Sequence, residues 1–314
     1  MSEAPGPRRG AGEAGEPSAG TAVRGDAWGT GGAGGAPPSP GHGAGAATGA
    51  WALPAQAVRA LPMLRVTERE ARVWARTWPT SLLTGVLTPV LFLGAMGVGL
   101  GGLVDDNRGT VDGVDYLSFV APGLLAATAL QAAAGDALWP VMTGLKWVKT
   151  FHAAAATPLT PAQVYGGYLA WIAARLLLTS TLFTAVAAVL GGVPSWWGAS
   201  APLAATLGGL AFAAPLAAYA AGQESDLPFS LVMRVAVIPM FLFSGTFFPV
   251  DQLPAGLEPV ARVAPLWHAV ELARGATTGA IAPAAVAGHT AFLLALLVAG
   301  CWWGGRAFRA RIAP

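Results

Sequence analysis

Charged side chains are scarce in this chain. Lys, Arg, Asp and Glu make up only 11% of its 314 residues, whereas 54% of the residues are apolar. Soluble domains carry roughly 25% charged residues, so this composition excludes an ordinary soluble fold. A net charge of +2 is too small to indicate a nucleic-acid partner. The composition therefore predicts an integral membrane protein with several spans.

Cysteine and nucleotide-binding motifs are also lacking. Cys301 is the only cysteine and lies in an apolar run beside Trp302, so neither a disulfide framework nor a cysteine metal site can form. A G-x-x-x-x-G-K-[ST] phosphate loop is absent, so the chain cannot bind and hydrolyse a nucleotide in that way. We predict no cofactor on this chain.

Two other chemical signals are weak. His268 and Glu271 stand at i and i+3, as metal ligands can, but no third ligand is evident nearby and polar packing is the simpler interpretation. Asp105 and Asp106 form one acidic pair. A membrane-embedded transferase would need a second acidic cluster to hold magnesium diphosphate. We therefore expect neither a metal site nor catalysis.

The chain divides into a tail and a membrane domain. Residues 1–50 are rich in Gly, Ala and Pro without apolar periodicity, and we expect this tail to be disordered. In residues 51–314 the first ordered element is a helix at Val66–Trp78. One of its faces is basic and the other is rich in tryptophan, which is typical of a helix in the headgroup layer. A solvated helix is the alternative.

Six apolar segments are long enough to cross a membrane. We predict spans at Pro79–Leu103, Tyr116–Trp139, Val164–Leu190, Ser200–Gly222, Leu227–Phe248 and Ala284–Trp303. The first contains Gly97 and Gly101 at GxxxG spacing, which permits a close helix contact. The predicted fold is all-α and integral to the membrane.

Charges in the loops predict the orientation. Arg65, Arg69, Arg72 and Arg76 lie just before the first span, Lys146 and Lys149 lie between the second and third, and three arginines follow the last. The positive-inside rule therefore places both termini in the cytoplasm. The short loop that carries Glu224 and Asp226 does not fit this rule.

The cytoplasmic loop from Trp139 to Pro161 contains a possible docking helix, Gly144–Ala153. On a helical wheel its basic side chains fall on one side and its aromatic side chains on the other. The helix either lies on the membrane surface or docks on a cytoplasmic partner. The basic side consists of Lys146, Lys149 and His152, and the aromatic side consists of Trp147 and Phe151.

Three of the Asp, Glu, Lys and Arg residues fall within the predicted spans, where a charge is costly unless it is paired or functional. Asp136 and Arg175 lie in consecutive antiparallel spans, so we expect an ion pair, with a role in facing the substrate as the alternative. Arg234 lies about two turns into the fifth span.

The segment Pro249–Pro283 is apolar but too rich in proline to be a single helix. Pro265 is placed to begin a short helix, Leu266–Ala273, on which His268, Glu271 and Arg274 share a face. We predict a re-entrant or interfacial hairpin between the fifth and sixth spans. Its key residues are Pro249, Pro265, Trp267, His268, Glu271 and Arg274.

Four stretches resemble a known family. The chain is similar to the permease subunits of type-2 ATP-binding-cassette exporters, especially the branch of lipooligosaccharide (nodulation-factor) and daunorubicin-type drug exporters. The resemblance covers about Leu64 to Arg311. The matching stretches are Tyr116–Leu125 (YLSFVAPGLL), Ala156–Pro161 (ATPLTP), Phe241–Pro254 (FLFSGTFFPVDQLP) and Pro265–His268 (PLWH).

This resemblance implies a six-span half-transporter in the plasma membrane of a bacterium. Gly144–Ala153 would be the coupling helix that docks on a separate ATPase subunit, which would bind ATP and magnesium. Pro249–Pro283 would be the external re-entrant element. Two permease copies, as a homodimer in the bilayer, would export an amphiphilic compound such as a lipid, a glycolipid or a polyketide-like drug. The alternatives are a membrane scaffold protein without transport and a membrane-embedded transferase.

Overall fold

The computed structural model describes residues 62–79, 87–95, 99, 110–111 and 113–312. Within these residues the regular elements are helices, joined by turns and by one isolated bridge between Val111 and Val114. The predicted all-α class is therefore confirmed for this part of the chain. The predicted tail, Gly97, Gly101, Asp105 and Asp106 lie outside the described residues.

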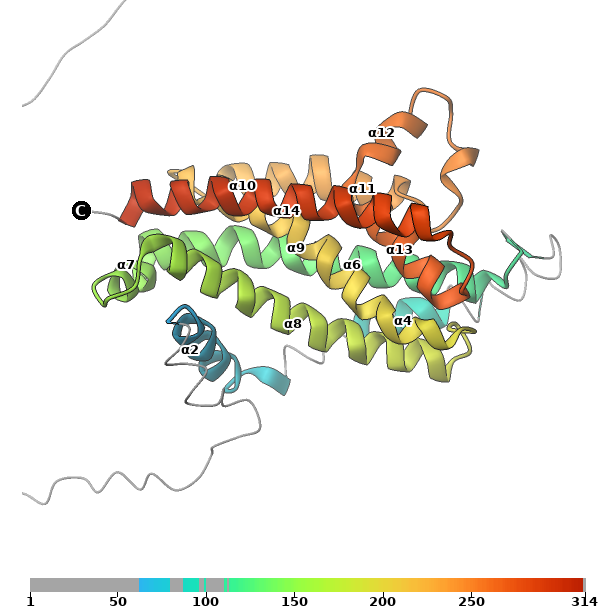
Figure 1. Ribbon diagram of the computed structural model, residues 1–314, viewed down its shortest axis with the longest axis horizontal. Coiled ribbons are helices and arrows are strands. Elements are labelled where there is room, and N and C mark those ends of the chain that lie inside the picture. The colour runs from blue at the N-terminus through green and yellow to red at the C-terminus, as the bar shows by residue number, and fades with distance from the viewer. Residues whose placement is uncertain (1–61, 80–86, 96–98, 100–109, 112, 313–314) are drawn as a thin grey trace, which may run out of the picture. The chain divides into compact units, whose positions relative to one another are not determined.

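Within the described residues, four helices are long and apolar enough to cross a membrane, and they match the second, third, fourth and sixth predicted spans. α8 runs antiparallel to α6, α9 and α14, and α9 packs against the other three (Figure 1). Most buried residues of α9 are alanine or glycine, which lets helix backbones approach closely. The four are α6 (Tyr116–Met142), α8 (Pro161–Val189), α9 (Ala201–Gly222) with the preceding turn η4 (Trp196–Ser200), and α14 (Pro283–Ile312).

The start of α8 is built by local sequence. Thr160 accepts a hydrogen bond from the backbone N–H of Gln163, and the Gln163 side chain accepts one from the Thr160 backbone N–H. Pro161 occupies the first helical position, where no N–H donor is needed. This is the capping box that the sequence predicts.

The fifth predicted span is shorter than expected. It consists of α10 (Leu227–Val232), the π-helical turn η5 (Met233–Val237) and α11 (Ile238–Phe243). The wide turn precedes Pro239, whose ring cannot continue a regular hydrogen-bond ladder. At 17 residues, Leu227–Phe243 is about 26 Å long and ends five residues before the predicted limit. Of the first predicted span, the structure describes α4 (Thr88–Leu93) and a few flanking residues.

The amphipathic helix α2 (Leu64–Trp74) packs on α8. The Thr67 hydroxyl donates to the carbonyl of Gly167 at 2.8 Å, and Trp74 meets Trp171 edge to face at 6.1 Å. Arg69 and Arg72 are exposed on the opposite side, which confirms the two-faced pattern. The helix ends four residues before the predicted limit.

The long helices begin and end at two opposite ends of the bundle. α6, α9 and α14 finish, and α8 begins, at the end that we call the Lys146 end, where α7 (Thr150–Ala155) also lies (Figure 1). At the other end, which we call the Trp196 end, lie η6 (Val250–Gln252), α12 (Glu258–Val263) and α13 (Pro265–Thr278) (Figure 1). α13 packs against α6, α9, α14 and η4.

Candidate functional site: the Lys146 end and the intramembrane charges

The loop between α6 and α8 is not the single helix Gly144–Ala153 that the sequence predicts. α6 continues into a π-helical turn, η3 (Thr143–Trp147), and the chain then turns sharply at Lys149 before α7. Lys149 has a φ of 56°, in the left-handed region that side chains other than glycine rarely adopt. This break separates residues that a continuous helix would have placed side by side.

The prediction that Trp147 and Phe151 form one aromatic docking face is therefore wrong. Phe151 is 2% exposed and packs between Tyr168 and Phe308, with ring centroids 5.3 and 5.5 Å away. Its ring also lies over Gly144, where a Cβ would come within 2.5 Å of it. Trp147 is 57% exposed and is followed by Val148 at 64%. In this loop, the exposed apolar side chains are thus those of Trp147 and Val148.

A cluster of charges fixes this loop to the rest of the bundle. Glu224, between α9 and α10, forms ion pairs with both Lys146 and Arg311. The hydrogen bond from the Lys146 ammonium, together with the Arg311 guanidinium, lowers the pKa of the Glu224 carboxyl to about 2. Arg311 also donates from Nε to the carbonyl of Ala221 at 2.9 Å, so it caps the end of α9. The cluster joins α6, α9 and α14.

His152, the remaining residue of the predicted basic face, is only partly exposed. Its Nδ1 atom is buried and has no hydrogen-bond partner among the described residues. It lines a cavity of about 90 Å³ with Lys146 and Arg311. The predicted basic face is therefore divided: Lys146 is held by Glu224, His152 turns inward, and Lys149 forms the sharp turn.

The expected ion pair between Asp136 of α6 and Arg175 of α8 is present. Their side chains are 14% and 27% exposed, so this pair is largely removed from the surface. The Tyr168 hydroxyl donates to the backbone carbonyl of Asp136 at 2.8 Å and joins the same two helices. Arg175 also lines a cavity of about 190 Å³ between α2 and α8. A structural role for the pair is thus supported.

Arg234 differs from that pair. It lies in the π-helical turn η5, its side chain is exposed, and no described residue pairs with it. Its neighbours Leu231, Val235 and Ile238 are also exposed, at 62%, 65% and 46%. Arg234 is thus a single cation on an apolar surface.

At the Trp196 end, Arg274 connects three segments. It forms an ion pair with Glu271 at 3.0 Å, donates to the carbonyl of Gly245, and lies over the ring of Phe119 at 3.9 Å. Gly123, one turn further along α6, approaches the backbone of Thr246 so closely that a Cβ would lie 2.7 Å from its carbonyl oxygen. Arg274 therefore holds α13, the start of α6 and the chain after α11 together.

The other predicted hairpin residues gather at the start of α13. Pro265 is the first residue of α13, as predicted, although the helix extends to Thr278. The Nδ1 atoms of His268 and His289 are 2.8 Å apart, and His268 stacks on Phe292 at 3.9 Å. Trp267 packs against both histidines, and Pro249 precedes η6. Among the described residues, no group of three His, Cys, Asp or Glu side chains is arranged to hold a metal ion.

Sequence reasoning missed Val148, Glu224 and Arg311. Val148 follows a tryptophan in a loop, and only the backbone turn at Lys149 exposes both of them. Glu224 did carry a signal, since it is an acidic residue in a loop where the positive-inside rule predicts basic ones. Its partners lie 78 and 87 residues away in the sequence. Sequence patterns could not identify these two partners of Glu224 because they are so far from it in the sequence.

The arrangement of apolar helices and the sequence of the chain define the class of protein. The profile of the ABC-2 type transporter family matches residues 63–277, and the chain belongs to this family. It is therefore a transmembrane transport subunit, a permease, rather than an enzyme. This confirms the resemblance that the sequence motifs indicate.

Individual proteins of this kind are similar to the chain over most of their length. The chain is 33% identical to nodulation protein J of Rhizobium leguminosarum bv. viciae over 221 residues, which are 70% of this chain and 83% of the relative. It is 32% identical to nodulation protein J of Rhizobium meliloti (strain 1021), over 67% of this chain and 79% of the relative. The inner membrane transport permease YadH of Escherichia coli (strain K12) is 23% identical, over 64% and 77%.

Proposed function

We propose that this chain is the permease subunit of an ATP-driven exporter of an amphiphilic compound. Its Lys146 end would face the cytoplasm and bind a separate ATPase subunit, which carries ATP and magnesium. Six spans, with both termini in the cytoplasm, complete the proposed topology. The observation that carries the proposal is the exposed apolar pair Trp147–Val148, held at the end of a buried helix.

The structure suggests how a movement of the ATPase would reach the bundle. Trp147 lies at the end of a continuous helical path from Tyr116, and Lys146 is joined through Glu224 to Arg311. A push on Trp147 would therefore act on α6 directly and on α9 and α14 through the charge cluster. Packed helices move as rigid bodies, so this end would transmit a displacement across the membrane.

The transported compound and the assembly belong to the same proposal. We propose that two copies of the chain form the exporter and that their exposed apolar surfaces along α10 and α11 contribute to the pathway. Arg234, a lone cation on that surface, would meet an anionic group of the substrate. A glycolipid, another lipid or a polyketide-like drug fits this chemistry, and the nodulation protein relatives favour the first.

The test is co-purification of the permease with a candidate ATPase subunit, together with permease-dependent ATP hydrolysis. Trp147→Ala should weaken docking by about 2 kcal/mol, the usual threshold for a residue that dominates an interface. Val148→Ala should weaken it less because a smaller side chain is removed. Both variants should fold, since neither side chain is buried.

The matched control is Leu190→Ala, which removes an exposed apolar side chain at the Trp196 end. It should leave co-purification and ATP hydrolysis unchanged. If Trp147→Ala binds the ATPase and supports hydrolysis as the unmodified chain does, the docking site lies elsewhere and the proposed coupling route is wrong.

A further inference from the structure

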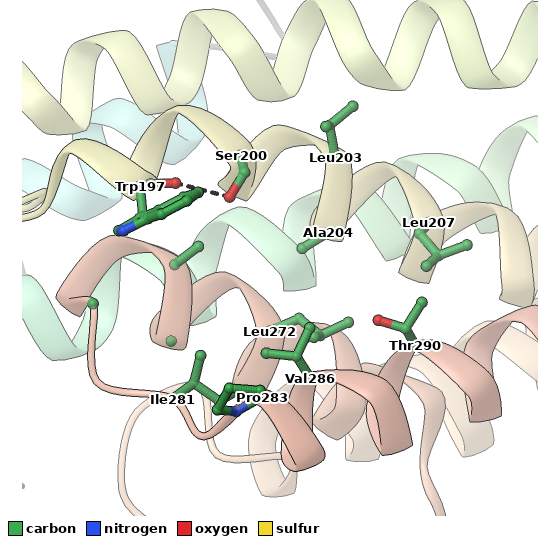
Figure 2. Close-up of a pocket in the computed structure, with 13 residues that line it drawn as sticks. Trp197, Ser200, Leu203, Ala204, Leu207, Leu272, Ile281, Pro283, Val286 and Thr290 are labelled. Carbon is green, nitrogen blue, oxygen red and sulfur yellow. Dashed lines mark hydrogen bonds between the residues drawn. The ribbon is translucent and has the colours of Figure 1, made fainter.

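A large apolar cavity lies at the Trp196 end, between α9 on one side and α13 and α14 on the other. Its volume is about 630 Å³, within the range of ligand-binding pockets. Figure 2 shows Leu207 of α9 across from Thr290 of α14, with Leu272 of α13 and Val286 of α14 beside them. All of its lining residues are uncharged.

The cavity extends from the membrane interface into the hydrocarbon layer. Pro283 begins α14, and Thr290 follows it by about 10 Å of helix rise. Trp196 and Trp197 at this end are 75% and 56% exposed, while Trp302, about 30 Å from Pro283 along α14, is 63% exposed. Exposed tryptophans at both ends of spanning helices mark the two membrane interfaces. Thr290 therefore lies inside the apolar layer.

Water is a poor occupant of this space. An ordered water needs two to four polar partners, and the cavity's side chains with a hydroxyl are Ser200 and Thr290. Ser200 already donates to the carbonyl of Trp197 at 2.8 Å, as the dashed line in Figure 2 shows. The space is partly open to the surroundings of the helices, so an apolar molecule from the membrane can enter it.

We propose that the cavity binds one acyl chain of a membrane phospholipid. The absence of charge in the lining excludes a headgroup, which would remain near Trp197 at the interface. The bound chain would fill the space between α13 and α14 and so support the position of α13. Because Arg274 on α13 holds Gly245 and Phe119, the lipid would stabilise the whole hairpin at this end.

The experiment uses the full-length chain in nanodiscs of phosphatidylcholine that contain a photoactivatable phospholipid, with a diazirine in its acyl chain. Labelled peptides are identified by mass spectrometry. Labelling around Leu207, Leu272 and Thr290 should exceed that around Leu294 and Val298, which are exposed on α14 but do not line the cavity. Uniform labelling of these α14 residues would mean ordinary contact with bulk lipid and would overturn the proposal.

Thr290→Trp fills the cavity from α14 and should reduce this labelling severalfold. Ala291→Trp adds the same ring one residue further on, at an exposed position outside the cavity, and should leave the labelling unchanged. Ala204→Phe fills the cavity from α9 and replaces Thr290→Trp if that variant does not fold. Undiminished labelling in a folded, filled variant overturns the proposal.

An export assay distinguishes a bound phospholipid from the transported compound as the occupant of the cavity. If Thr290→Trp lost ATP-dependent export while phospholipid labelling persisted, the cavity would serve the transported compound instead, and the proposal would be wrong. Labelling requires neither ATP nor the ATPase. Its failure would therefore leave the proposed export function untouched, and failure of the export assay would leave the lipid site standing.

Discussion

At the scale of single residues, Lys149 has the least favourable backbone geometry in the described part of the chain. Its φ of 56° brings Cβ close to the following carbonyl oxygen, a conformation that costs about 1–2 kcal/mol for residues with a Cβ. The turn is nevertheless kept because it lets α7 fold back and bury Phe151. The strain is thus balanced by packing a few ångströms away.

Replacing Lys149 with glycine should relieve this strain. We expect Lys149→Gly to raise the free energy of unfolding by about 1 kcal/mol, since glycine adopts the left-handed region without a steric penalty. The measurement is thermal unfolding of the purified chain in detergent. Lys149→Ala is the control, because it removes the charge but keeps the Cβ. Equal effects of the two substitutions would show that charge rather than backbone strain is responsible.

Replacing Phe151 and replacing Trp147 with alanine should have very different effects on stability. Phe151→Ala removes a buried ring between Tyr168 and Phe308 and should destabilise the chain by about 3–5 kcal/mol. Trp147→Ala, at an exposed position, should change stability by no more than about 0.5 kcal/mol. Both are compared by thermal unfolding without the ATPase. A stable Phe151→Ala variant would contradict the burial of this ring.

At the scale of elements, a few polar contacts hold the helices of the bundle together, although the helices themselves contain few polar residues. Asp136–Arg175 joins α6 to α8, Glu224 joins α6, α9 and α14, and Arg274 joins α13 to α6. The hydroxyls of Thr67, Tyr165 and Tyr168 add hydrogen bonds to backbone carbonyls of neighbouring helices. Most other contacts between helices are made by alanine, glycine and larger apolar side chains, which fix distance but only weakly fix register. The polar contacts therefore decide which turns of the helices lie side by side.

A double-mutant cycle tests the Asp136–Arg175 contact. Asp136→Asn or Arg175→Leu alone leaves an unpaired polar group and should cost about 2 kcal/mol, between the values for surface and buried pairs. The double variant should lose less than the sum of the two single losses. Thermal unfolding and expression level are the readouts. Strictly additive losses would argue against a direct contact and for a role in facing the substrate.

At the scale of the whole molecule, the distribution of charge predicts the orientation in the membrane. The Lys146 end carries Lys146, Lys149, Arg309 and Arg311, whereas the described part of the Trp196 end carries Arg262 and Arg274. The positive-inside rule counts basic side chains near the ends of the spans and gives acidic ones little weight. The Lys146 end is therefore expected inside the cell.

Impermeant thiol labelling tests this orientation. After Cys301→Ser removes the native thiol, cysteines are introduced at Thr157 in the α6–α8 loop and at Gly256 between η6 and α12, both of which are exposed. In intact cells we expect Gly256→Cys to react and Thr157→Cys to react only after the cells are opened. Equal labelling of both positions in intact cells would overturn the proposed topology.

Much of the architecture was already determined by the sequence. Apolar runs in a chain with 11% charged residues give the membrane class, and four of the predicted spans recur as long helices. The Thr160–Gln163 capping box and Pro265 set helix starts because capping depends on neighbouring residues alone. The Asp136–Arg175 pair could be predicted because two buried opposite charges in adjacent antiparallel helices lower their energy by meeting.

Tertiary structure alone decided what happens in the loops. A helical wheel placed Trp147 beside Phe151, but the backbone turn at Lys149 buries one and exposes the other, because burying Phe151 between α8 and α14 outweighs the local strain. Glu224 found its partners 78 and 87 residues away, which no local pattern encodes. The cavity between α9, α13 and α14 exists only once those helices pack. Periodicity determines which residues form helices, whereas long-range packing determines which surfaces remain free.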